Sequence, residues 1–535
     1  MFKIAVTYFG NNELHSLEVG YGVSALKKHD SNLSVHKIDE SNIQTEIDSI
    51  ASVHPNMIAI FLSYNCYDLL LELSSQLKSL LDDVFIVICH SAASCLAELL
   101  LKDNRCIDVA VIGEFENTLS ELCALISEKK DYKRCKGIAY MNNGEYVMTD
   151  DRAISEIESI SPPERDCFPN DTRFFHVYGS RGCEGRCGFC DRNILYTNTG
   201  GHGVTRFRDI DDVVREVDSL VERYNCKFVS FSDPTFCSTS NIIDRLEKLY
   251  SCLSQRNYWI QFSMNLRAEQ ITPEVVMCMN KLKNVGLGKV FIGIESFNEF
   301  DLKLYGKFSN AKSNVNAISV LQNINSSYDD YILRIEYGFI NFNPYSNVEG
   351  LKNNLSNLRK CDVHIDPYII SSKLSLNYLT KLTKFVNKDS LFVKDISRFT
   401  VGELLNYRFE YRFINRDVQD IYYIILSCYK ELKLRNINGS EFIRNRYYHY
   451  YGYDRIVEKF DITFREWLSV VNDFSCDLFE YIISSEQEYN DKLSRAISMC
   501  DEFKKQFITV DNNLRGIQQR AVLQLKKNDE LIYYR

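Results

Sequence analysis

The chain has 535 residues, of which 45% are hydrophobic and 25% are charged. A chain of this length is expected to form about three domains, and its composition is that of a folded globular protein, so a single small module and wholesale disorder are both excluded. Its 63 Lys and Arg residues against 72 Asp and Glu residues leave a formal net charge of -9. A net negative charge gives no positive electrostatic potential that would attract a polyanion, so we expect no nucleic-acid partner.

The chain also lacks the signs of export. No stretch reaches the ~20 apolar residues that a membrane helix needs, and the opening MFKIAVTYFGNNELHS has no basic flank or apolar core of a signal peptide. We therefore expect a cytoplasmic protein with no membrane partner. Many of the 18 cysteines lie in apolar segments, as Cys66, Cys123 and Cys278 do. This scatter favours buried thiols over a disulfide framework.

Strand and helix patterns alternate through the first part of the chain. Nearly continuous apolar runs predict five strands at 3–9, 34–38, 57–64, 84–90 and 108–113, and amphipathic segments predict helices at 18–29, 68–81, 92–101 and 118–127. Such an alternation is typical of a doubly wound α/β domain. The Asn143-Gly144 pair between two β-prone runs predicts a closing hairpin. We assign this Rossmann-like domain to residues 1–149.

A proline-rich linker is predicted at 150–172, where Pro162, Pro163 and Pro169 fall close together. The alternation then resumes over 173–372. Its predicted strands lie at 176–180, 227–233, 259–265, 289–296, 332–340 and 364–371, separated by helical patterns. About six βα units predict a parallel, partial (β/α)6 barrel, with its ligand site at the carboxyl ends of the strands.

The last part of the chain, 373–535, reads as mostly helical. The segments 420–434, 464–482 and 489–507 have helical periodicity and carry no recognisable chemistry. A run of tyrosines from Tyr447 to Tyr453 leaves two interpretations open. This region either caps the barrel opening and holds the substrate, or forms an ordinary packed helical domain.

The strongest chemical motif is GSRGCEGRCGFCDRN, directly after the first strand of the second domain. Cys183, Cys187 and Cys190 are spaced so that three thiols on one loop can converge on one metal centre, because soft thiolates select zinc, copper(I) or iron–sulfur clusters. No fourth ligand close to the motif completes a structural zinc site. The alternative is a zinc site in which Cys167 or His202 is the fourth ligand. Three protein ligands leave one metal position open, as in a catalytic centre.

Three arginines surround these thiols in the sequence. Arg181, Arg186 and Arg192 are expected to offset the negative charge of the thiolates and of a bound cluster.

This motif, with the aromatic Phe189 before its last cysteine, resembles that of the radical SAM enzymes, and the resemblance extends from about residue 173 to 370. It implies that Cys183, Cys187 and Cys190 hold a [4Fe–4S] cluster whose open iron binds S-adenosylmethionine (SAM). It also implies that the reduced cluster cleaves SAM to methionine and a 5′-deoxyadenosyl radical, which abstracts hydrogen from an unactivated C–H position. An electron-donor protein is then needed as reductant. No catalytic residue is assigned beyond the cluster ligands.

The same resemblance suggests further SAM contacts at successive strand ends. Asp233 is similar to the acidic residue that meets the methionine ammonium, Arg267 stands near the expected position of the carboxylate, and Glu295 would sit by the ribose hydroxyls. Turn formation by Asp233 and an ordinary strand-end role for Glu295 are the alternatives. The segment from 334 to 344 departs from the glycine-rich pattern usual at the fifth strand.

The order of the two domains resembles the cobalamin-binding subgroup of radical SAM proteins. Gly113, Glu114, Glu116, Thr118 and Leu119 match its Gly-Glu-x-Glu-x-Thr-Leu signature. Phe115 replaces a usual glycine, and 88–94 stands where the subgroup has a Gly-Gly turn that lets the cofactor approach the backbone. Either the domain binds cobalamin, or it kept the fold and lost the cofactor.

These observations favour a radical SAM enzyme, with cobalamin-dependent methyl transfer in a biosynthetic or peptide-modifying pathway as the leading reaction. A cobalamin-free radical SAM enzyme, a methylthiotransferase-like protein and a non-catalytic iron–sulfur partner are the alternatives. The methylthiotransferase reading needs a second cluster, and Cys66, Cys89 and Cys95 lack the setting for it. The substrate, whether a small molecule, a carrier-bound intermediate or a peptide, is not encoded in any recognisable motif.

Overall fold

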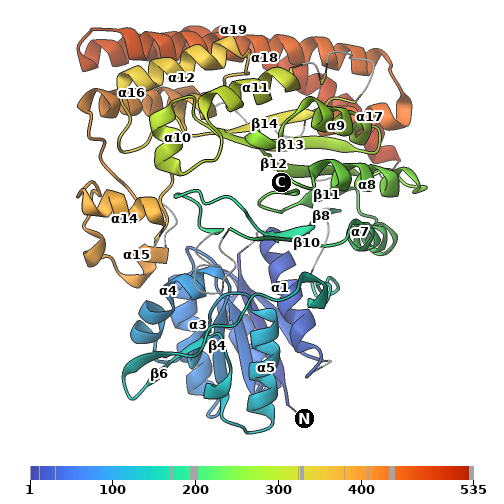
Figure 1. Cartoon of the computed structure of the whole chain (residues 1–535), viewed down its shortest axis with the longest axis vertical. Coiled ribbons are helices and arrows are strands. Elements are labelled where there is room, and N and C mark those ends of the chain that lie inside the picture. The colour runs from blue at the N-terminus through green and yellow to red at the C-terminus, as the bar shows by residue number, and fades with distance from the viewer. Residues whose placement is uncertain are drawn as a thin grey trace. The chain divides into compact units, whose positions relative to one another are not determined.

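The computed structural model of the chain is shown in Figure 1. The structure describes residues 2–10, 13–30, 32–168, 173–192, 203–322, 324–325, 331–378, 380–405, 409–432 and 440–528. The chain forms two compact units, and each is made of separate segments. Unit 1 contains Met1–Pro169, Ser180–Arg208 and Ser375–Glu410, and unit 2 contains Asn170–Gly179, Asp209–Leu374 and Tyr411–Arg535. The four-part division made from the sequence stays a prediction.

Unit 1 is built on a seven-stranded sheet of order β2-β1-β3-β4-β5-β6-β7. Its first five strands are parallel, and their order is that of a flavodoxin-like doubly wound sheet. The strands are β1 (Ile4–Phe9), β2 (Ser34–Ile38), β3 (Met57–Phe61), β4 (Phe85–Cys89), β5 (Val109–Val111), β6 (Ile138–Asn142) and β7 (Glu145–Met148). Strands β1, β3 and β5 are fully buried, which explains their continuous apolar runs. The expected doubly wound domain is confirmed.

Helices cover both faces of this sheet (Figure 1). Helices α1 and α5 pack together, as do α2 and α3. The helices are α1 (Glu13–Leu26), α2 (Ile43–Val53), α3 (Tyr67–Leu80), α4 (Ser91–Asp103) and α5 (Glu116–Ser127). The predicted hairpin forms β6 and β7, and both turn residues, Asn143 and Gly144, have positive φ angles of 51° and 90°. Both central residues of a type I′ turn have positive φ, which Asn-Gly adopts readily.

The predicted linker is packed against unit 1 over its described residues. Within 150–168 the only regular element is a short 3-10 turn, Ile157–Ser159. The backbone N–H of Glu164 donates to the carbonyl of Gly20 in α1 at 2.9 Å. A Cβ on Gly20 would lie 2.5 Å from the carbonyl oxygen of Glu164, so only glycine allows this close approach.

Two later segments complete unit 1. One contributes an antiparallel ribbon of β9 (Ser180–Gly182) and β10 (Thr205–Phe207). The other contributes α14 (Lys381–Lys388) and α15 (Val401–Leu405), with a 3-10 turn at Ile396–Arg398. Helix α15 packs on α3 and α4, with Gly402 against the ring of Tyr67.

Unit 2 contains a parallel five-stranded sheet of order β14-β13-β12-β11-β8. The strands are β8 (Phe174–Val177), β11 (Phe228–Phe231), β12 (Gln261–Arg267), β13 (Leu287–Glu295) and β14 (Arg334–Phe339). Between and after them lie α7 (Ile210–Tyr224), α8 (Ile242–Ser254), α9 (Pro273–Lys283), α10 (Glu299–Tyr305), α11 (Ala311–Leu321) and α12 (Val348–Lys360), with a 3-10 turn at Ala268–Gln270. The α/β class and the parallel central sheet are confirmed.

The sixth predicted strand, 364–371, is wrong. This segment forms the short helix α13 (Pro367–Ser371), and only a single parallel bridge between Phe342 and Lys373 continues the sheet. Asp366 accepts a hydrogen bond from the N–H of Ile369 at 2.9 Å, and Pro367 takes the first helical position. An N-cap aspartate followed by proline starts a helix more readily than it continues a strand.

The C-terminal helices of unit 2 are α16 (Arg416–Leu432), α17 (Ser440–Tyr451), α18 (Arg455–Ser484) and α19 (Tyr489–Lys527). Helices α18 and α19 lie side by side, and α18 packs on α12 (Figure 1). None of the helices in the described ranges is long and apolar enough to span a membrane. The expected helical character of this region is confirmed.

Helix α17 packs against the amino-terminal edge of the unit 2 sheet. Phe442 packs edge-on to Phe228 at the start of β11, and Arg446 donates to the side chain of Gln261 at the start of β12. Ligand sites of parallel α/β sheets lie at the carboxyl ends of the strands. The tyrosine-bearing helix therefore packs at the opposite edge, which favours the packed-domain interpretation over substrate capping.

A buried ion pair connects α17 to α18. Arg444 donates from Nε and Nη2 to the two carboxylate oxygens of Asp461 at 3.0 and 2.9 Å, and both side chains are almost fully buried. We expect Arg444→Met to lower the free energy of unfolding by about 3–5 kcal/mol, because it leaves the Asp461 carboxylate buried without its cation. Urea unfolding measures this loss.

The matched control is Arg495→Met, since Arg495 pairs with Glu502 on the exposed surface. This change is expected to cost less than about 1 kcal/mol. Equal losses in the two variants would contradict the assignment of the Arg444 pair as a major contributor.

Candidate active site

The cysteine loop belongs to unit 1 and starts from the β9–β10 ribbon. Cys183 follows β9 directly, and the N–H of Cys190 donates to the carbonyl of Cys187 at 3.2 Å, which turns the chain between these two residues. The N–H of Gly185 lies 3.3 Å from Sγ of Cys183, as a hydrogen-bond donor to sulfur. All three cysteines are half-buried thiols outside any disulfide, and Phe189 between them is also half-buried.

The donor set fits an iron–sulfur cluster in its chemistry. Three thiols on one loop are the ligands such clusters use, and backbone N–H groups aimed at sulfur tune them. Burial raises the pKa of the Cys190 thiol to about 12, and the charge of Asp191 adds to this effect. Among the described residues, no group of three or more Cys, His, Asp or Glu side chains stands ready to hold a metal ion. Cys183, Cys187 and Cys190 would hold such a cluster as thiolates, so its binding would release their thiol protons.

A hydrogen bond also connects the cysteine loop to helix α14 of unit 1. The N–H of Leu382 in α14 donates to the carbonyl of Gly188 at 3.0 Å. Residues 193–202, which include the possible zinc ligand His202, lie outside the described residues.

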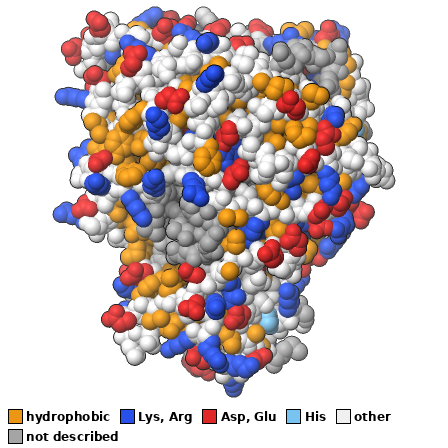
Figure 2. Space-filling view, in the orientation of Figure 1, with side chains coloured by type: hydrophobic (Ala, Val, Ile, Leu, Met, Phe, Trp, Pro, Cys, Tyr) orange, Lys and Arg blue, Asp and Glu red, His pale blue; other side chains and the backbone are white. Residues whose placement is uncertain are grey.

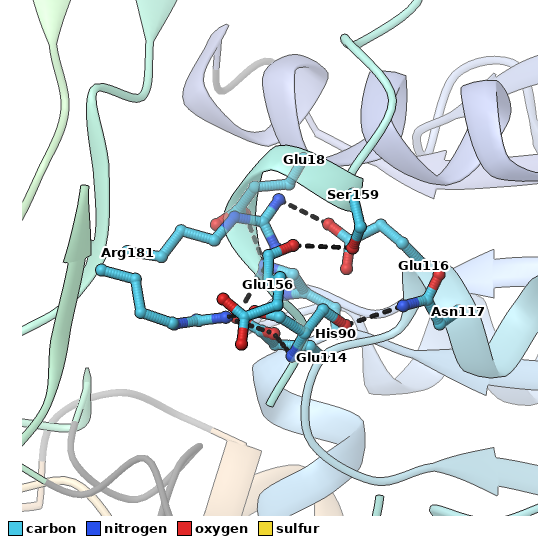
Figure 3. A network of polar contacts seen from close by, with 10 residues as sticks. Glu18, His90, Glu114, Glu116, Asn117, Glu156, Ser159 and Arg181 are labelled. Atoms are coloured by element: carbon cyan, nitrogen blue, oxygen red, sulfur yellow. Dashed lines mark hydrogen bonds and ion pairs between the residues drawn. The ribbon is translucent and has the colours of Figure 1, made fainter. Parts of the chain in front are cut away.

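Arg181 forms ion pairs that were not expected from the sequence. Its guanidinium lies 2.5 Å from Oε1 of Glu116 and 3.7 Å from Oε1 of Glu114 (Figure 3). It also stacks over the ring of Tyr21. Its charge is thus paired with two carboxylates from the segment that follows β5. The sequence could not reveal this pairing, because the partners are more than 60 residues apart.

The predicted SAM contacts belong to unit 2. Asp233, Arg267 and Glu295 come after or at the carboxyl ends of β11, β12 and β13, which are neighbours in the sheet. Carboxyl ends of parallel strands meet at one edge, so these three residues share it. The cysteines and these residues are thus distributed over the two units.

Asp233 is fully buried and connects two strand ends. Its Oδ2 accepts from the N–H of Gly179 at 3.2 Å, and its carbonyl accepts from the side chain of Asn265 at 2.7 Å. Arg267 is held by an ion pair with Glu269 and stacks over the ring of Phe308 at 4.9 Å.

Glu295 has the most unusual backbone at this edge. Its φ angle is +67°, a left-handed conformation that side chains other than glycine seldom adopt, and the pairing of β13 with β14 shifts register there. Strain of this kind clusters at functional sites. Its carboxylate lies against Gly293 and Gly338, where a Cβ would come within 2.6 and 3.5 Å of it.

Lys307 is a site residue that the sequence did not reveal. Its ammonium lies 3.5 Å from Oε1 of Glu295 and donates to the carbonyl of Gly293 at 3.0 Å, and its side chain is only 6% exposed. Nothing in the segment around Lys307 signals this contact, since the lysine precedes an exposed Phe308 in an ordinary polar loop.

The carboxyl edge of the unit 1 sheet is filled by side chains at the positions where the cobalamin-binding pattern has glycines. Phe115 is buried and packs edge-on to Phe61, with ring centroids 5.2 Å apart. His90 follows β4 with a φ angle of +90°, and its two ring nitrogens contact Glu18 and the carbonyl of Leu62 (Figure 3). Burial alone would lower the pKa of His90, but the Glu18 carboxylate outweighs it and raises the pKa.

Comparison with known proteins identifies the central part of the chain. Residues 177–334 match the sequence profile of the Radical SAM superfamily. This segment is a radical SAM domain. It spans β8 to the start of β14 and includes the cysteine loop, Asp233, Arg267 and Glu295.

Two named proteins are similar in sequence to part of this chain. An uncharacterized methyltransferase of Pyrococcus horikoshii is 27% identical over 249 residues, which are 45% of this chain and 52% of the relative. A protein of Methanocaldococcus jannaschii named as a methylthiotransferase is 24% identical over 325 residues, covering 56% of this chain and 62% of that protein. The chain thus spans only about half to three fifths of these relatives.

The whole chain shares its fold with a solved structure. The cobalamin-dependent S-adenosylmethionine radical enzyme OxsB, with aqua-cobalamin bound, superposes with a TM-score of 0.69 over 100% of this chain and 82% of OxsB. The sequence identity is 16%, so this similarity establishes the fold alone. The α/β class expected from the sequence is thus also the class of a fold that OxsB shares.

Proposed function

We propose that this protein is a radical SAM enzyme that modifies an unactivated C–H position of its substrate. The observation that carries the proposal is the Cys183, Cys187 and Cys190 loop inside a segment that matches the superfamily profile. A bound, reduced [4Fe–4S] cluster supplies the electron that splits SAM into methionine and a 5′-deoxyadenosyl radical. An electron-donor protein would act as reductant. Anaerobic reconstitution followed by a SAM-cleavage assay tests the proposal, which fails if reduced, iron-loaded protein leaves SAM intact.

The chain's own residues would bind and orient SAM in this proposal. The three cysteines would hold the cluster, Asp233 the methionine ammonium, Arg267 its carboxylate and Glu295 the ribose hydroxyls. Lys307 orients the Glu295 carboxylate through an ion pair that is largely removed from solvent.

Glu295→Gln is expected to weaken SAM binding about 10- to 100-fold, because hydrogen bonds to a charged acceptor contribute more than neutral ones. SAM titration followed by the EPR spectrum of the reduced cluster measures the change. Glu336→Gln on the adjacent strand β14 is the control, since Glu336 pairs with Lys289 within the sheet ladder. Equal affinities for SAM in the Glu295 variant and the wild type would remove Glu295 from the site.

The first candidate reaction is cobalamin-dependent methyl transfer. The fold of OxsB and the name of the Pyrococcus relative support it. Cobalamin would have to bind at the carboxyl edge of the unit 1 sheet, where the topological switch between β1 and β3 lies. The described edge does not fit it as it stands, because His90, Glu18 and Phe115 fill the space that glycines would leave open. We derive no catalytic step through cobalamin.

The second candidate is a cobalamin-free radical SAM reaction: rearrangement, oxidation or bond formation. The filled edge of the unit 1 sheet is the observation that favours it. Purification with cobalamin supplied, followed by iron, sulfide and corrinoid quantitation, separates the two candidates. A stoichiometric corrinoid excludes the second, and iron without corrinoid excludes the first.

A methylthiotransferase is less well supported, despite the name of the Methanocaldococcus relative. Cys66, Cys89 and Cys95 lack the setting for the second cluster that this group needs. From Arg416 onward the regular elements in the described residues are helices. Lys, Arg, Asp and Glu side chains are interspersed on the face seen in Figure 2, without a field of one sign. We therefore propose no nucleic-acid partner, and a small molecule, a carrier-bound intermediate or a peptide as substrate.

A further inference from the structure

The β9–β10 ribbon that begins and ends the cysteine loop pairs two arginines. Arg181 and Arg206 are register partners across its antiparallel strands, on either side of the loop. Directly opposed side chains on such a ribbon lie about 5 Å apart at Cβ, and like charges at these positions destabilise the pairing. Both side chains are nearly buried, at 11% and 12% exposure, so water screens this repulsion poorly.

Two carboxylates from the first domain compensate these charges. Glu114 follows β5, and its carboxylate bridges the two arginines: Oε2 accepts from Nη1 of Arg206 at 3.1 Å, and Oε1 lies 3.7 Å from Arg181. Glu116, in the first turn of α5, lies 2.5 Å from Arg181. Both carboxylates are less than 10% exposed, and Figure 3 shows Arg181 directed toward them.

The two positive charges of the arginines are compensated only when both glutamates are ionised and in place. Burial alone would raise the pKa of Glu114, but the hydrogen bond from Arg206 and the charges of both arginines lower it. The helix dipole at the start of α5 adds to the stability of the Glu116 carboxylate. The N–H of Ser155 donates to Glu114 at 3.3 Å and fixes the orientation of its carboxylate. Without Glu114, two buried guanidiniums would face each other at the base of the loop.

We propose that Glu114 and Glu116 are positioning residues that clamp the base of the cysteine loop. They hold Arg181 and Arg206 in register, so that the ribbon fixes where Cys183 leaves the first domain before any iron enters. This inference rests on the proposed cluster function. It assigns to two acidic residues of the Gly-Glu-x-Glu-x-Thr-Leu pattern a role toward the cysteine loop.

The test compares Glu114→Gln with Glu121→Gln. Glu121 lies in α5, as Glu116 does, and pairs with an arginine outside the ribbon, Arg152. In iron-free protein, we expect amide hydrogen exchange in 180–182 and 205–207 to be at least about 10-fold faster in Glu114→Gln, because a charged hydrogen-bond acceptor is lost. The Glu121 variant should exchange there as the wild type does.

Cluster loading provides the second readout. Glu114→Gln is expected to bind less than half of the wild-type iron and sulfide, and to give a broadened EPR signal after reduction, whereas Glu114→Asp should recover part of both. Unchanged ribbon exchange and an unchanged EPR spectrum in Glu114→Gln would overturn the clamp. The same changes in Glu121→Gln would also overturn it, because they would show general destabilisation.

The failures of the two proposals are distinguishable. Wild-type protein that binds no iron after reconstitution would overturn the proposed function, and the exchange measurement on iron-free protein would still decide whether the ribbon depends on Glu114. A wild-type protein that cleaves SAM, with a Glu114 variant identical to it in exchange and spectrum, would overturn the clamp alone.

Discussion

Alanine at Cys183, Cys187 or Cys190 is expected to abolish cluster binding and SAM cleavage. In the proposed site each substitution removes one of the three cysteine ligands of the loop, and the loop sequence from Cys183 to Cys190 contains no other cysteine to replace it. Iron content should fall below about a tenth of the wild-type value, and 5′-deoxyadenosine formation should fall to background, because metal affinity depends on the complete ligand set. Iron analysis and chromatography of the cleavage products after anaerobic reduction measure both.

Cys123→Ala is the matched control. Cys123 is buried in the middle of α5, far in sequence from the loop, and burial raises the pKa of its thiol to about 12. Such a thiol behaves as a small apolar side chain. The variant should keep its iron and its activity, with a modest loss of stability from the small cavity. SAM cleavage that survives in the triple alanine variant would refute the assignment of the loop.

Opening the filled edge of unit 1 is expected to increase corrinoid binding. His90 occupies a backbone conformation that suits glycine, at φ +90°, so His90→Gly removes the imidazole without backbone strain. Glu18→Gln is added so that no buried carboxylate is left without its partner. We expect the double variant to bind cobalamin at least about 10-fold more tightly than the wild type, since the cost of displacing the His90–Glu18 contact disappears. Equilibrium dialysis with the visible spectrum of bound cobalamin measures it.

Each other outcome has a definite meaning. Stoichiometric corrinoid in the wild type would show that the edge opens by itself, and would support methyl transfer. Weaker binding in the double variant would show that His90 contacts the corrinoid. Absence of binding in both proteins would mean that this edge is no corrinoid site, and would support the cobalamin-free reaction.

The regular elements could be predicted where one physical signal dominates. The buried strands of the first domain are continuous apolar runs, and the Asn143-Gly144 turn dictates its hairpin. The segment 364–371 has the β propensity of a strand, since it is rich in isoleucine and tyrosine. There the local Asp366-Pro367 start signal outweighed β propensity, and helix α13 formed.

The site could be predicted only in part. The cysteines could be recognised because they lie close together in the sequence. Asp233, Arg267 and Glu295 could be placed at one edge of the sheet because each follows or ends a predicted parallel strand. Contacts between residues far apart in the chain leave no recognisable pattern in the amino-acid sequence. The partner of Glu295, Lys307, and the pairing of Arg181 with Glu114 and Glu116 depend on tertiary structure, which has no sequence period.

The division of unit 1 into three separate chain segments bears on how the protein can be made. Because Ser375–Glu410 belongs to unit 1, this unit is complete only after Glu410 has left the ribosome. A nascent first domain would expose the surface of α3 and α4 on which α15 later packs, including the ring of Tyr67 beside Gly402. Expression of residues 1–149 alone should therefore give an aggregation-prone fragment, and folding in the cell would benefit from a chaperone that protects this surface during synthesis.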